Sequence, residues 1–533
     1  MYSELKNPRR WVLTEALKEQ ASLKPDGEWV TDSEGRSLSF GQAQDQSLQA
    51  AAFFEGLGVT RGTRVGVFVF NGTPFVTAWL GLFQLGATAV LYNTELRGSF
   101  LRHQLNDSAV ECVVVDAGLV PVLNEIAGEL PHLKTVVVVD GDASAANPAW
   151  RAVQWPEWTT QPKWSGPAPE PQDIACIMYT SGTSGPSKGV LMPHAHCTLY
   201  GVGTVRAAQL TDRDRYYICL PLFHANGLLI QLGATILAGI PAYVQRRFSA
   251  SGWLADIREC RATVTNLLGA TAGFILSQPP GEQDRAHQLR ASLNAPNLAE
   301  HHAAFTSRFG VRDVISGFGM TEVNMPVLGR IGQPAPGAAG WVDTDHFDVC
   351  IADPETDMPL PPGSVGEILV RPKIPFGFMA GYFNAPAKTV EAWRNLWFHT
   401  GDAGTMREDG LVTFIDRIKD CIRRRGENIS ATEVEDIVAA LPGVAEVAAY
   451  AVPTDLAGGE DEVMLALVPK EGEPLDAAEI ARRAAEKLPR FAKPRYVKIV
   501  PALPKTATGK VQRAVLRQQG TEGAMDLEAG ARR

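Results

Sequence analysis

The chain has 533 residues, more than the roughly 100–200 that one domain usually contains, so we expect two or more domains. Hydrophobic residues make up 45% and charged residues 20%, which argues against a disordered, collagen-like or membrane-spanning chain. The formal charge of −9 gives no overall attraction for nucleic acid, so we expect no nucleic-acid partner.

The cysteines and the first residues indicate the compartment. Seven cysteines are scattered without a CxxC pair, which argues against a secreted disulfide framework. The opening MYSELKNPRRW carries charges but lacks the apolar core of a signal peptide, so we expect a cytoplasmic protein. Gly, Pro and Asn interrupt the two long uncharged stretches, 65–94 and 219–244, which favours buried α/β segments over integral membrane helices.

Along the first 150 residues, Val-rich runs alternate with helical segments. The predicted strands are 65–70, 87–92, 111–116 and 134–140, and the predicted helices are 73–86 and 99–106. Strands that alternate with helices predict parallel sheets covered on both faces. The fold class is therefore α/β.

His194, His196 and Cys197 lie close together in the sequence, and side chains of these types bind zinc. No second pair of ligands is found elsewhere in the chain. We therefore expect no zinc at these three residues.

A second, smaller unit is predicted to begin near residue 417. Ser430 and Glu433 form a capping-box pattern, and apolar residues then recur along one helix face until Pro442. Two strands, a helix and a further strand follow, which predicts a compact α+β unit of roughly 100 residues. The predicted organisation is a large N-terminal domain of parallel or mixed sheets (1–416), a hinge (417–419), a small mobile α+β domain (420–519) and a disordered tail (520–533).

The sharpest motif is YTSGTSGPSKGV at 179–190, which follows an apolar strand. Its glycines let successive backbone N–H groups turn toward one anion, its hydroxyls add donors, and Lys188 adds positive charge. A Walker A loop would need GxxxxGK[ST], and the residues on both sides of Lys188 violate that pattern. The motif predicts a phosphate-binding loop rather than a plain polar loop.

At this motif the chain resembles the adenylate-forming, AMP-binding superfamily of acyl-CoA synthetases, whose loop reads roughly [YF]TSG[ST]TGxPKG. Here Ser184 stands for the usual Thr and Ser187 for the usual Pro. Further motifs follow in the family's order: GFGMTE at 317–322, WFHTGD at 397–402, FIDRIKDCIRRRGENIS at 414–430 and PKTATGKVQR at 504–513. The resemblance covers the chain from about Ser39 to Arg513.

The resemblance implies roles for single residues. Thr321 would contact the α-phosphate of ATP, Glu322 would bind Mg²⁺, and Lys510 would be the lysine required for adenylation. His224, in PLFHANG, matches a position that lines the acyl-carboxylate site; the alternative is a histidine of the core. The implied nucleotide-binding residues are Thr180, Ser181, Gly182, Thr183, Ser184, Gly185 and Lys188 in the loop, the Gly317–Phe318 backbone beside adenine, and Asp402 and Arg417 at the ribose.

The family transfers its adenylate to a thiol after the small domain rotates. In this chain the resemblance places the hinge at Lys419 and the CoA path at Gly426, Glu427 and Asn428. Many members have a second glycine where this chain has Arg425, which could lie beside the pantetheine path or contact the phosphates of CoA.

Within the family, the run at 261–280 and the context of GFGMTE look most like crotonobetaine/carnitine-CoA ligases. Substrates of that subgroup would call for an aromatic cage or a carboxylate in the acyl pocket, and such residues cannot be placed from the sequence. The pocket is expected from residues 224–229, 266–271, 317–320 and 337–341.

The predicted enzyme is an AMP-forming acid–thiol ligase that uses ATP, Mg²⁺ and CoA, with a small carboxylic acid as its partner and a homodimer left open. A second hypothesis keeps adenylation but gives the adenylate to an amine, a carrier-protein thiol or another acceptor. A third, a non-catalytic adenylate-binding protein, is disfavoured by the phosphate loop, Glu322 and Lys510.

Overall fold

The computed structural model describes residues 1–180, 186–417, 422–425, 427–454, 460–470, 472–505 and 511–529, with the backbone alone at 156, 157, 416, 417, 428, 432 and 514. The chain forms two compact units. Unit 1 comprises Met1–Thr94, Leu105–Tyr179 and Gly189–Asp416; unit 2 comprises Glu95–Gln104, Thr180–Lys188 and Arg417–Arg533.

The first sheet contains the predicted Val-rich strands, and its central strands are parallel. Its order is β20 (Gly381–Tyr382), β9 (Lys188–Pro193), β8 (Ile174–Thr180), β4 (Thr88–Leu91), β3 (Arg64–Phe68), β5 (Cys112–Asp116), β6 (Thr135–Val139) and β7 (Arg151–Gln154). The strands predicted from the Val-rich runs are confirmed, as is the α/β class.

The second sheet of unit 1 is formed by successive strand–helix segments of the chain. Its strands from β14 to β1 in the order below are parallel to their neighbours. Its order is β14 (Asp313–Ile315), β13 (Ala291–Ala295), β12 (Val264–Leu268), β10 (Tyr216–Ile218), β11 (Ala242–Val244), β1 (Glu28–Asp32) and β2 (Ser37–Ser39). Because these strands are parallel, the residues that follow β10, β12, β13 and β14 meet at one edge of the sheet.

The third sheet is antiparallel and carries two of the predicted motifs. Its order is β15 (Gly317–Met320), β16 (Asn324–Leu328), β17 (Gly340–Val342), β23 (Leu411–Arg417), β22 (Trp397–Met406), β19 (Gly366–Pro372) and β18 (Phe347–Ala352), with β21 (Trp393–Arg394) paired to β22.

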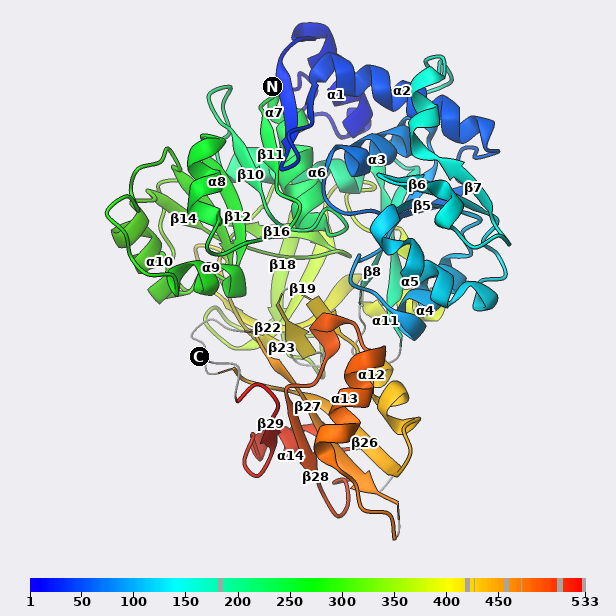
Figure 1. Cartoon of the computed structure of the whole chain (residues 1–533). Coiled ribbons are helices and arrows are strands. Elements are labelled where there is room, and N and C mark those ends of the chain that lie inside the picture. The colour runs from blue at the N-terminus through cyan, green and yellow to red at the C-terminus, as the bar shows by residue number, and fades with distance from the viewer. Residues whose placement is uncertain are drawn as a thin grey trace. The chain divides into compact units, whose positions relative to one another are not determined.

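Helices cover these sheets, and Figure 1 shows α1, α2 and α3 packed together. Helix α3 begins with Pro74 in its first turn and ends at Gly86, whose φ of 71° is the left-handed conformation that glycine adopts readily. The helices that lie wholly or partly in unit 1 are α1 (Leu13–Leu23), α2 (Phe40–Gly56), α3 (Thr73–Leu85), α4 (Gly98–Ser108), α5 (Val120–Glu125), α6 (His194–Ala207), α7 (Gly233–Ala238), α8 (Trp253–Glu259), α9 (Gly269–Leu276), α10 (Ala299–Ala304) and α11 (Pro386–Ala392), with π-helices at Asn226–Leu232 and Phe305–Phe309.

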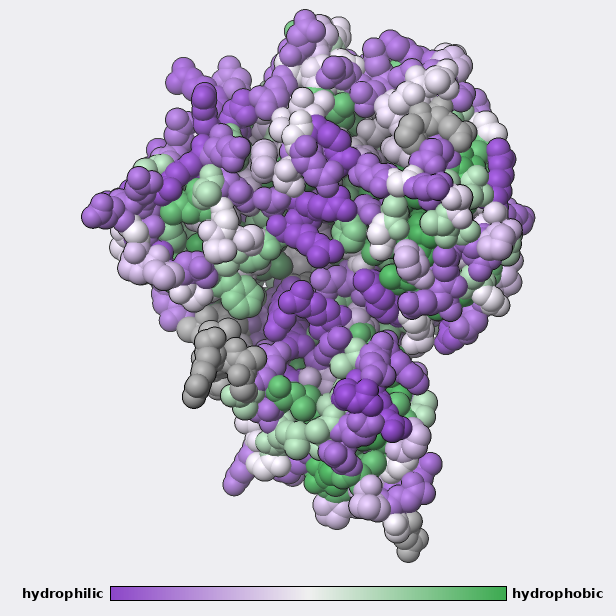
Figure 2. Space-filling model, viewed as in Figure 1, coloured by the Kyte–Doolittle hydropathy of each residue, from purple (hydrophilic) through white to green (hydrophobic). Residues whose placement is uncertain are grey.

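The surface and the core follow the sequence pattern. The uncharged stretches 65–94 and 219–244 are almost wholly buried in unit 1. The face drawn in Figure 2 is mainly hydrophilic, with hydrophobic residues in small groups. Among the described residues, no helix is long and apolar enough to cross a membrane.

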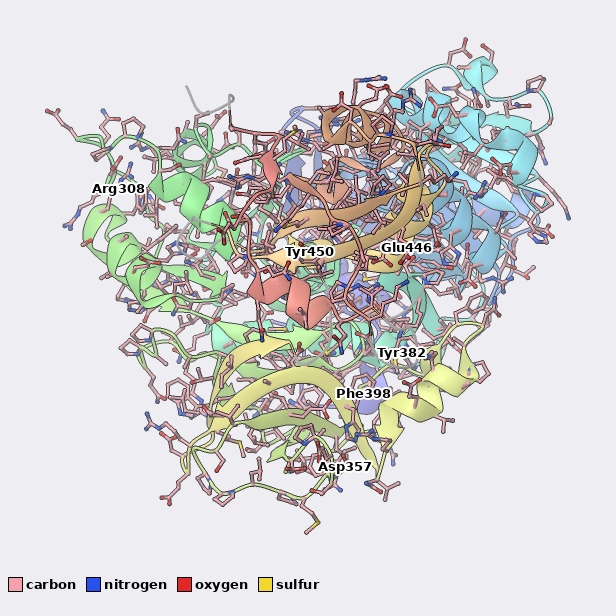
Figure 3. The ribbon with its side chains drawn as sticks, turned by 90° about the horizontal axis from the view of Figure 1, so that it is seen from below. Arg308, Asp357, Tyr382, Phe398, Glu446 and Tyr450 are labelled. Carbon is pink, nitrogen blue, oxygen red and sulfur yellow. The ribbon has the colours of Figure 1, made fainter. Side chains whose placement is uncertain are left out.

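Unit 2 has a hydrophobic core of its own, which includes Tyr450 on β26 (labelled in Figure 3). The Ser430 hydroxyl accepts a hydrogen bond from the Glu433 backbone N–H, so the predicted helix cap is present. The remaining elements are β24 (Ile422–Arg424) with β25 (Glu427–Ile429), the sheet β26 (Val444–Val452), β27 (Glu462–Pro469), β28 (Tyr496–Ile499) and β29 (Met525–Asp526), and helices α12 (Ala431–Ala439), α13 (Ala477–Lys487) and α14 (Arg513–Gln518).

The prediction of a disordered tail after Gln519 is wrong for residues 520–529. Strand β29 pairs antiparallel with β28, and Arg495 forms an ion pair with Asp526 at 3.1 Å. The polar composition of the tail concealed these contacts, because its acidic residues bind arginines about 30 to 100 positions away.

Candidate active site

The Thr321–Glu322 motif lies at the tip of a tight hairpin. Strands β15 and β16 pair with Met320 opposite Asn324, so Thr321, Glu322 and Val323 form a three-residue turn. Asn324 closes the turn with a φ of 69°. Three-residue hairpins need a residue in this left-handed conformation, and Asn adopts it more readily than most side chains.

The glycines of GFGMTE allow the two strands of the hairpin to approach closely. A Cβ at Gly319 would lie 2.2 Å from the Asn324 carbonyl oxygen, and one at Gly317 would lie 2.5 Å from the end of Met325. Between them, Phe318 is buried and its ring stacks on Phe414 with centroids 6.2 Å apart. The motif therefore presents backbone at both glycines and fixes an aromatic ring between them.

Two side chains from helix α6 hold the turn through its backbone. The Tyr200 hydroxyl donates to Met320 O at 2.8 Å, and His196 Nε2 lies 2.9 Å from Thr321 O. The Asn324 amide donates to His196 O at 2.8 Å and lies 3.3 Å from His196 Nδ1. These contacts tie the turn to a buried helix at three points.

His196 is neutral in this setting, because complete burial lowers the pKa of its imidazole to about 4. Its Nδ1 also lies 3.0 Å from Gly377 O. Each ring nitrogen lies beside a backbone carbonyl oxygen, and the neutral ring carries one proton, so it donates to either Thr321 O or Gly377 O. With the proton on Nε2, Nδ1 can accept from the Asn324 amide.

Glu322 is the buried carboxylate of the turn, with 5% of its surface exposed. The hydroxyl of Tyr382, on strand β20 and labelled in Figure 3, donates to Glu322 Oε1 at 2.9 Å. The Glu322 carbonyl also accepts from Met379 N–H at 3.1 Å. A single buried carboxylate suits Mg²⁺, which is usually bound by one or two carboxylates together with substrate phosphates. Among the described residues, no group of three or more His, Cys, Asp or Glu could hold a metal by itself.

Asp402 and His224, two further predicted residues, also lie in unit 1. Asp402 is 2% exposed on β22, where its backbone N–H donates to Thr400 Oγ1 at 3.1 Å. His224 follows β10 in a turn closed by its own N–H and Pro221 O, and its ring lies 4.6 Å from that of Phe223. It is partly exposed, which sets it apart from the fully buried His196.

The predicted phosphate loop joins two neighbouring strands, with Thr180 at the end of β8 and Lys188 at the start of β9. Its residues Ser181, Gly182, Thr183, Ser184 and Gly185 lie outside the described residues. Ser187, which replaces the family's proline, donates its backbone N–H to Glu433 Oε1 at 3.4 Å within unit 2. Proline could not make this bond, because it has no N–H.

The other predicted residues belong to unit 2. Lys419, Gly426 and Lys510 lie outside the described residues, and the side chains of Arg417 and Asn428 are not described. Arg425 is exposed with a φ of 55°, and its Nη2 lies 3.7 Å from Glu528 Oε1. The residue that replaces the usual glycine thus keeps a glycine-like backbone conformation and faces an acidic residue of the tail.

The sequence did not identify His196, Tyr200 or Tyr382 as residues of the site. Each acts on the turn across 60 to 125 positions, so no local motif contains them. The sequence singled out His196 only as a zinc-binding type of residue beside His194 and Cys197, where no zinc was expected. Its spacing of four residues from Tyr200 on a helix was the available signal, since such residues share one helix face.

Comparisons with known proteins find similarity along most of the chain. A family model described as AMP-binding enzyme matches residues 17–383, and one described as AMP-binding enzyme C-terminal domain matches residues 433–510. A crotonobetaine/carnitine–CoA ligase of Salmonella paratyphi A is 30% identical over 485 residues, which cover 89% of this chain and 92% of that protein.

Solved structures show the same architecture. An anthranilate CoA ligase in complex with anthranoyl-AMP matches with a TM-score of 0.70 and 25% identity, covering 95% of this chain and 97% of that one. An amide bond synthetase from Marinactinospora thermotolerans matches with a TM-score of 0.80 over 95% of this chain and 99% of that one. At 22% identity, the second likeness is one of fold alone.

Proposed function

The chain belongs to the AMP-binding enzyme family as an adenylate-forming acid–thiol ligase, and from this premise we propose how its own residues carry the reaction. In the first step a carboxylate oxygen attacks the α-phosphorus of ATP, and the bond to the β-phosphate breaks to release pyrophosphate. In the second step the thiol of CoA attacks the acyl carbon, and AMP leaves.

The observation that carries this proposal is the hairpin turn with its buried carboxylate. Both reactants of the first step are negative, so the catalyst must neutralise charge and hold an in-line geometry. Glu322 would hold Mg²⁺, which supplies positive charge at the phosphates, and Thr321 would donate to the α-phosphate. Because His196 and Tyr200 fix the turn by its carbonyls, these groups need no rearrangement when the substrates bind.

The remaining roles are proposed from the motifs. The loop from Thr180 to Lys188 would bind the β- and γ-phosphates, Asp402 and Arg417 would hold the ribose hydroxyls, and Gly317–Phe318 would flank adenine. His224 would line the carboxylate of the acid. Lys510 would bridge that carboxylate and the α-phosphate, where charge develops in the transition state.

The first experiment supplies ATP, Mg²⁺ and a panel of acids, and it measures pyrophosphate and AMP with and without CoA. We expect pyrophosphate with a suitable acid and AMP release that CoA accelerates. Lys510→Ala should lose adenylation by about 10²–10³-fold while ATP still binds, since it removes a donor to the transition state. Unchanged pyrophosphate release by this variant would contradict the role of Lys510.

Transfer of the adenylate to an amine or a carrier-protein thiol is the second candidate. Arg425 favours it, because a long side chain with Glu528 beside it stands where many thiol-transferring members have glycine. Gly426→Leu separates the two candidates: it should abolish thioester formation and spare pyrophosphate release if CoA passes this residue. AMP release that needs an amine or carrier protein and ignores CoA would favour the second candidate.

We also propose that residues 417–419 act as the hinge about which the small domain rotates between the two half-reactions. The division into compact units falls between Asp416 and Arg417. Lys419→Pro fixes φ near −65° and removes one N–H, so it should change the two half-reactions unequally. An equal fall in both, measured separately, would argue against the hinge.

A further inference from the structure

A π-helix, Asn226–Leu232, begins two residues after His224. π-Helical turns are rare in proteins and occur frequently at functional sites. The wider turn brings residues five positions apart onto one face. Asn226 and Gln231 have this spacing, and the Gln231 amide donates to Asn226 Oδ1 at 3.2 Å. The π-helix thus creates a contact that an α-helix would not make.

Asn226 also ends a chain of hydrogen bonds that begins in the sheet. Tyr216 on β10 is fully buried, and its hydroxyl donates to Asn266 Oδ1 on the neighbouring strand β12 at 2.6 Å. A buried tyrosine hydroxyl needs an acceptor, and burial raises the pKa of Tyr216 so that the proton stays in place. The Asn266 amide nitrogen is therefore turned toward Asn226, and it donates to Asn226 Oδ1 at 3.0 Å.

These two bonds determine the orientation of the Asn226 amide. Its oxygen accepts from both Asn266 and Gln231, which fills the two lone pairs of a carbonyl. The nitrogen of the same amide carries two N–H groups and points away from Asn266 and Gln231. The Asn226 side chain is partly exposed, and this nitrogen has no acceptor among the described residues. The result is an amide donor whose direction is fixed before any ligand binds.

Gln231 shows that this arrangement is not simply the most stable one. It is fully buried, and its Oε1 has no hydrogen-bond partner in the described part of the chain. An unpaired buried acceptor is destabilising, and in native proteins it calls for an explanation such as a functional constraint. The Gln231 amide nitrogen keeps its bond to Asn226 while the oxygen of the same amide stays unpaired.

The donor lies where ligands bind in sheets of this kind. His224 and Asn226 follow β10, so both lie beyond the carboxyl edge of the parallel strands, and Asn266 in the middle of β12 holds Asn226 from within the sheet. Figure 1 shows β10 and β12 side by side in the green part of unit 1. Asn226 is two residues from His224, the residue proposed at the carboxylate of the acid.

We propose that Asn226 determines the substrate class: its amide donates a hydrogen bond to a neutral oxygen of the acid, so the substrates are hydroxy or oxo monocarboxylic acids with that oxygen a few carbons from the carboxylate. This inference rests on the proposed function. Tyr216, Asn226, Gln231 and Asn266 are all uncharged, so the network offers no cation for a second carboxylate, which is costly to bury without one.

The test compares matched acids by pyrophosphate release with ATP and Mg²⁺. The panel holds butanoate with its 2-hydroxy, 3-hydroxy, 4-hydroxy and 3-oxo derivatives, and benzoate with 2-hydroxybenzoate. The chain should prefer at least one oxygenated acid over its unsubstituted partner by roughly tenfold or more in kcat/KM, since a site built to bind an oxygen rejects the analogue that lacks it. The hydroxy and oxo members distinguish the two sources of that oxygen.

Asn226→Leu is close in size and removes the donor. We expect the ratio of oxygenated to unsubstituted acid to fall toward one, through loss of activity on the oxygenated acid alone. Asn226→Asp keeps the shape but replaces the donor with an acceptor, so it should lose oxo acids, which can only accept, even if the leucine variant fails to fold. Asn124→Leu, on α5, removes an amide elsewhere in unit 1 and should leave the ratio unchanged.

Asn266→Leu tests the positioning role, because it frees Asn226 to rotate. The variant should raise KM for the oxygenated acid severalfold. Its kcat on the unsubstituted acid should fall by a smaller factor. Equal kcat/KM for every matched pair, or a ratio unchanged in Asn226→Leu, would overturn the inference and leave adenylation intact. No pyrophosphate with any acid would overturn the proposed function and this inference with it, so the two failures are distinguishable.

Discussion

The two compact units hold their functional segments by different chemistry. In unit 1, the Thr321–Glu322 turn is fixed by His196 and Tyr200, both buried and neutral. In unit 2, Arg424 is 3% exposed and lies 2.5 Å from Glu462, while its other nitrogens bind backbone carbonyls and the tail. Hydrogen bonds between uncharged, packed groups set a geometry that salt does not screen. A buried ion pair stabilises the fold only while every charged partner is present.

The ion-pair cluster of unit 2 gives the largest expected effect on stability. Arg424→Met removes the nearer cation of Glu462 and the donor to Lys493 O, and it leaves that buried carboxylate with Arg495 alone, at 3.5 Å. Breaking one side of a buried pair costs about 3–5 kcal/mol. We expect unit 2 to melt separately and earlier, measured by calorimetry. Arg482→Met, on an exposed face of α13, is the control and should change little.

If Arg424→Met instead leaves melting unchanged, the buried cluster does not hold unit 2 together. A double variant with Glu462→Met would then be expected to behave like the single one. If the cluster does matter, that double variant should recover much of the lost stability, because no charge remains buried alone.

The turn that this neutral network holds should affect chemistry more than stability, because it carries the Glu322 carboxylate. Glu322→Gln keeps an oxygen for the Tyr382 hydroxyl, so the turn should fold as before. The proposed Mg²⁺ ligand loses its charge, and adenylation should fall by about 10²–10³-fold, the effect typical of losing one transition-state contact. Pyrophosphate release measures this. Glu111→Gln, an exposed carboxylate of the same unit paired with Lys134, should keep full activity. A clearly larger loss of melting temperature in Glu322→Gln than in Glu111→Gln would show that Glu322 is structural.

Much of this fold follows from local sequence, and the comparison explains which parts do not. The Val-rich strands and the Ser430 cap were predictable, because alternation and capping are properties of neighbouring residues. The holding of the turn by His196 and the ordering of the tail by Arg495 were not. Both depend on partners brought together only by the tertiary fold. The π-helix after His224 was hidden for another reason, since its apolar run has no period that distinguishes π from α.

The two units should also respond to acid in opposite directions. Burial lowers the pKa of His194 and of His196 to about 4, below the usual 6.5, so the unfolded chain binds more protons between these values. Unit 1 is therefore expected to lose stability as pH falls from 6.5 to 4, by about 1.4 kcal/mol per pH unit for each histidine.

In unit 2, burial raises the pKa of Glu433 to about 7, although Ser187 and His103 favour its charged form and Asp436 opposes it. Its contribution is present in full below about 4.5 and is lost as pH rises through 7. Hydrogen exchange of α6 and α12 between pH 5 and 7, corrected for intrinsic rates, should show protection changing with opposite signs. Glu433→Gln should flatten the response of α12 and leave that of α6, and parallel responses in the two helices would contradict this contrast.

The smallest effect expected concerns Arg425, the residue that replaces a glycine of the family. Its φ of 55° costs about 1–2 kcal/mol for a residue with a side chain, and glycine avoids that cost. Its contact with Glu528, at 3.7 Å and exposed, contributes about 0–1 kcal/mol. Arg425→Gly should therefore leave unit 2 equally stable or up to about 2 kcal/mol more stable. If Arg425 binds the phosphates of CoA, the same change should raise KM for CoA while pyrophosphate release stays constant.

Arg425→Ala keeps the backbone strain and loses the charge, so it separates the two contributions: it should raise KM for CoA as glycine does and gain no stability. A variant that is more stable and has an unchanged KM for CoA would show that Arg425 contributes neither to the stability of unit 2 nor to the binding of CoA.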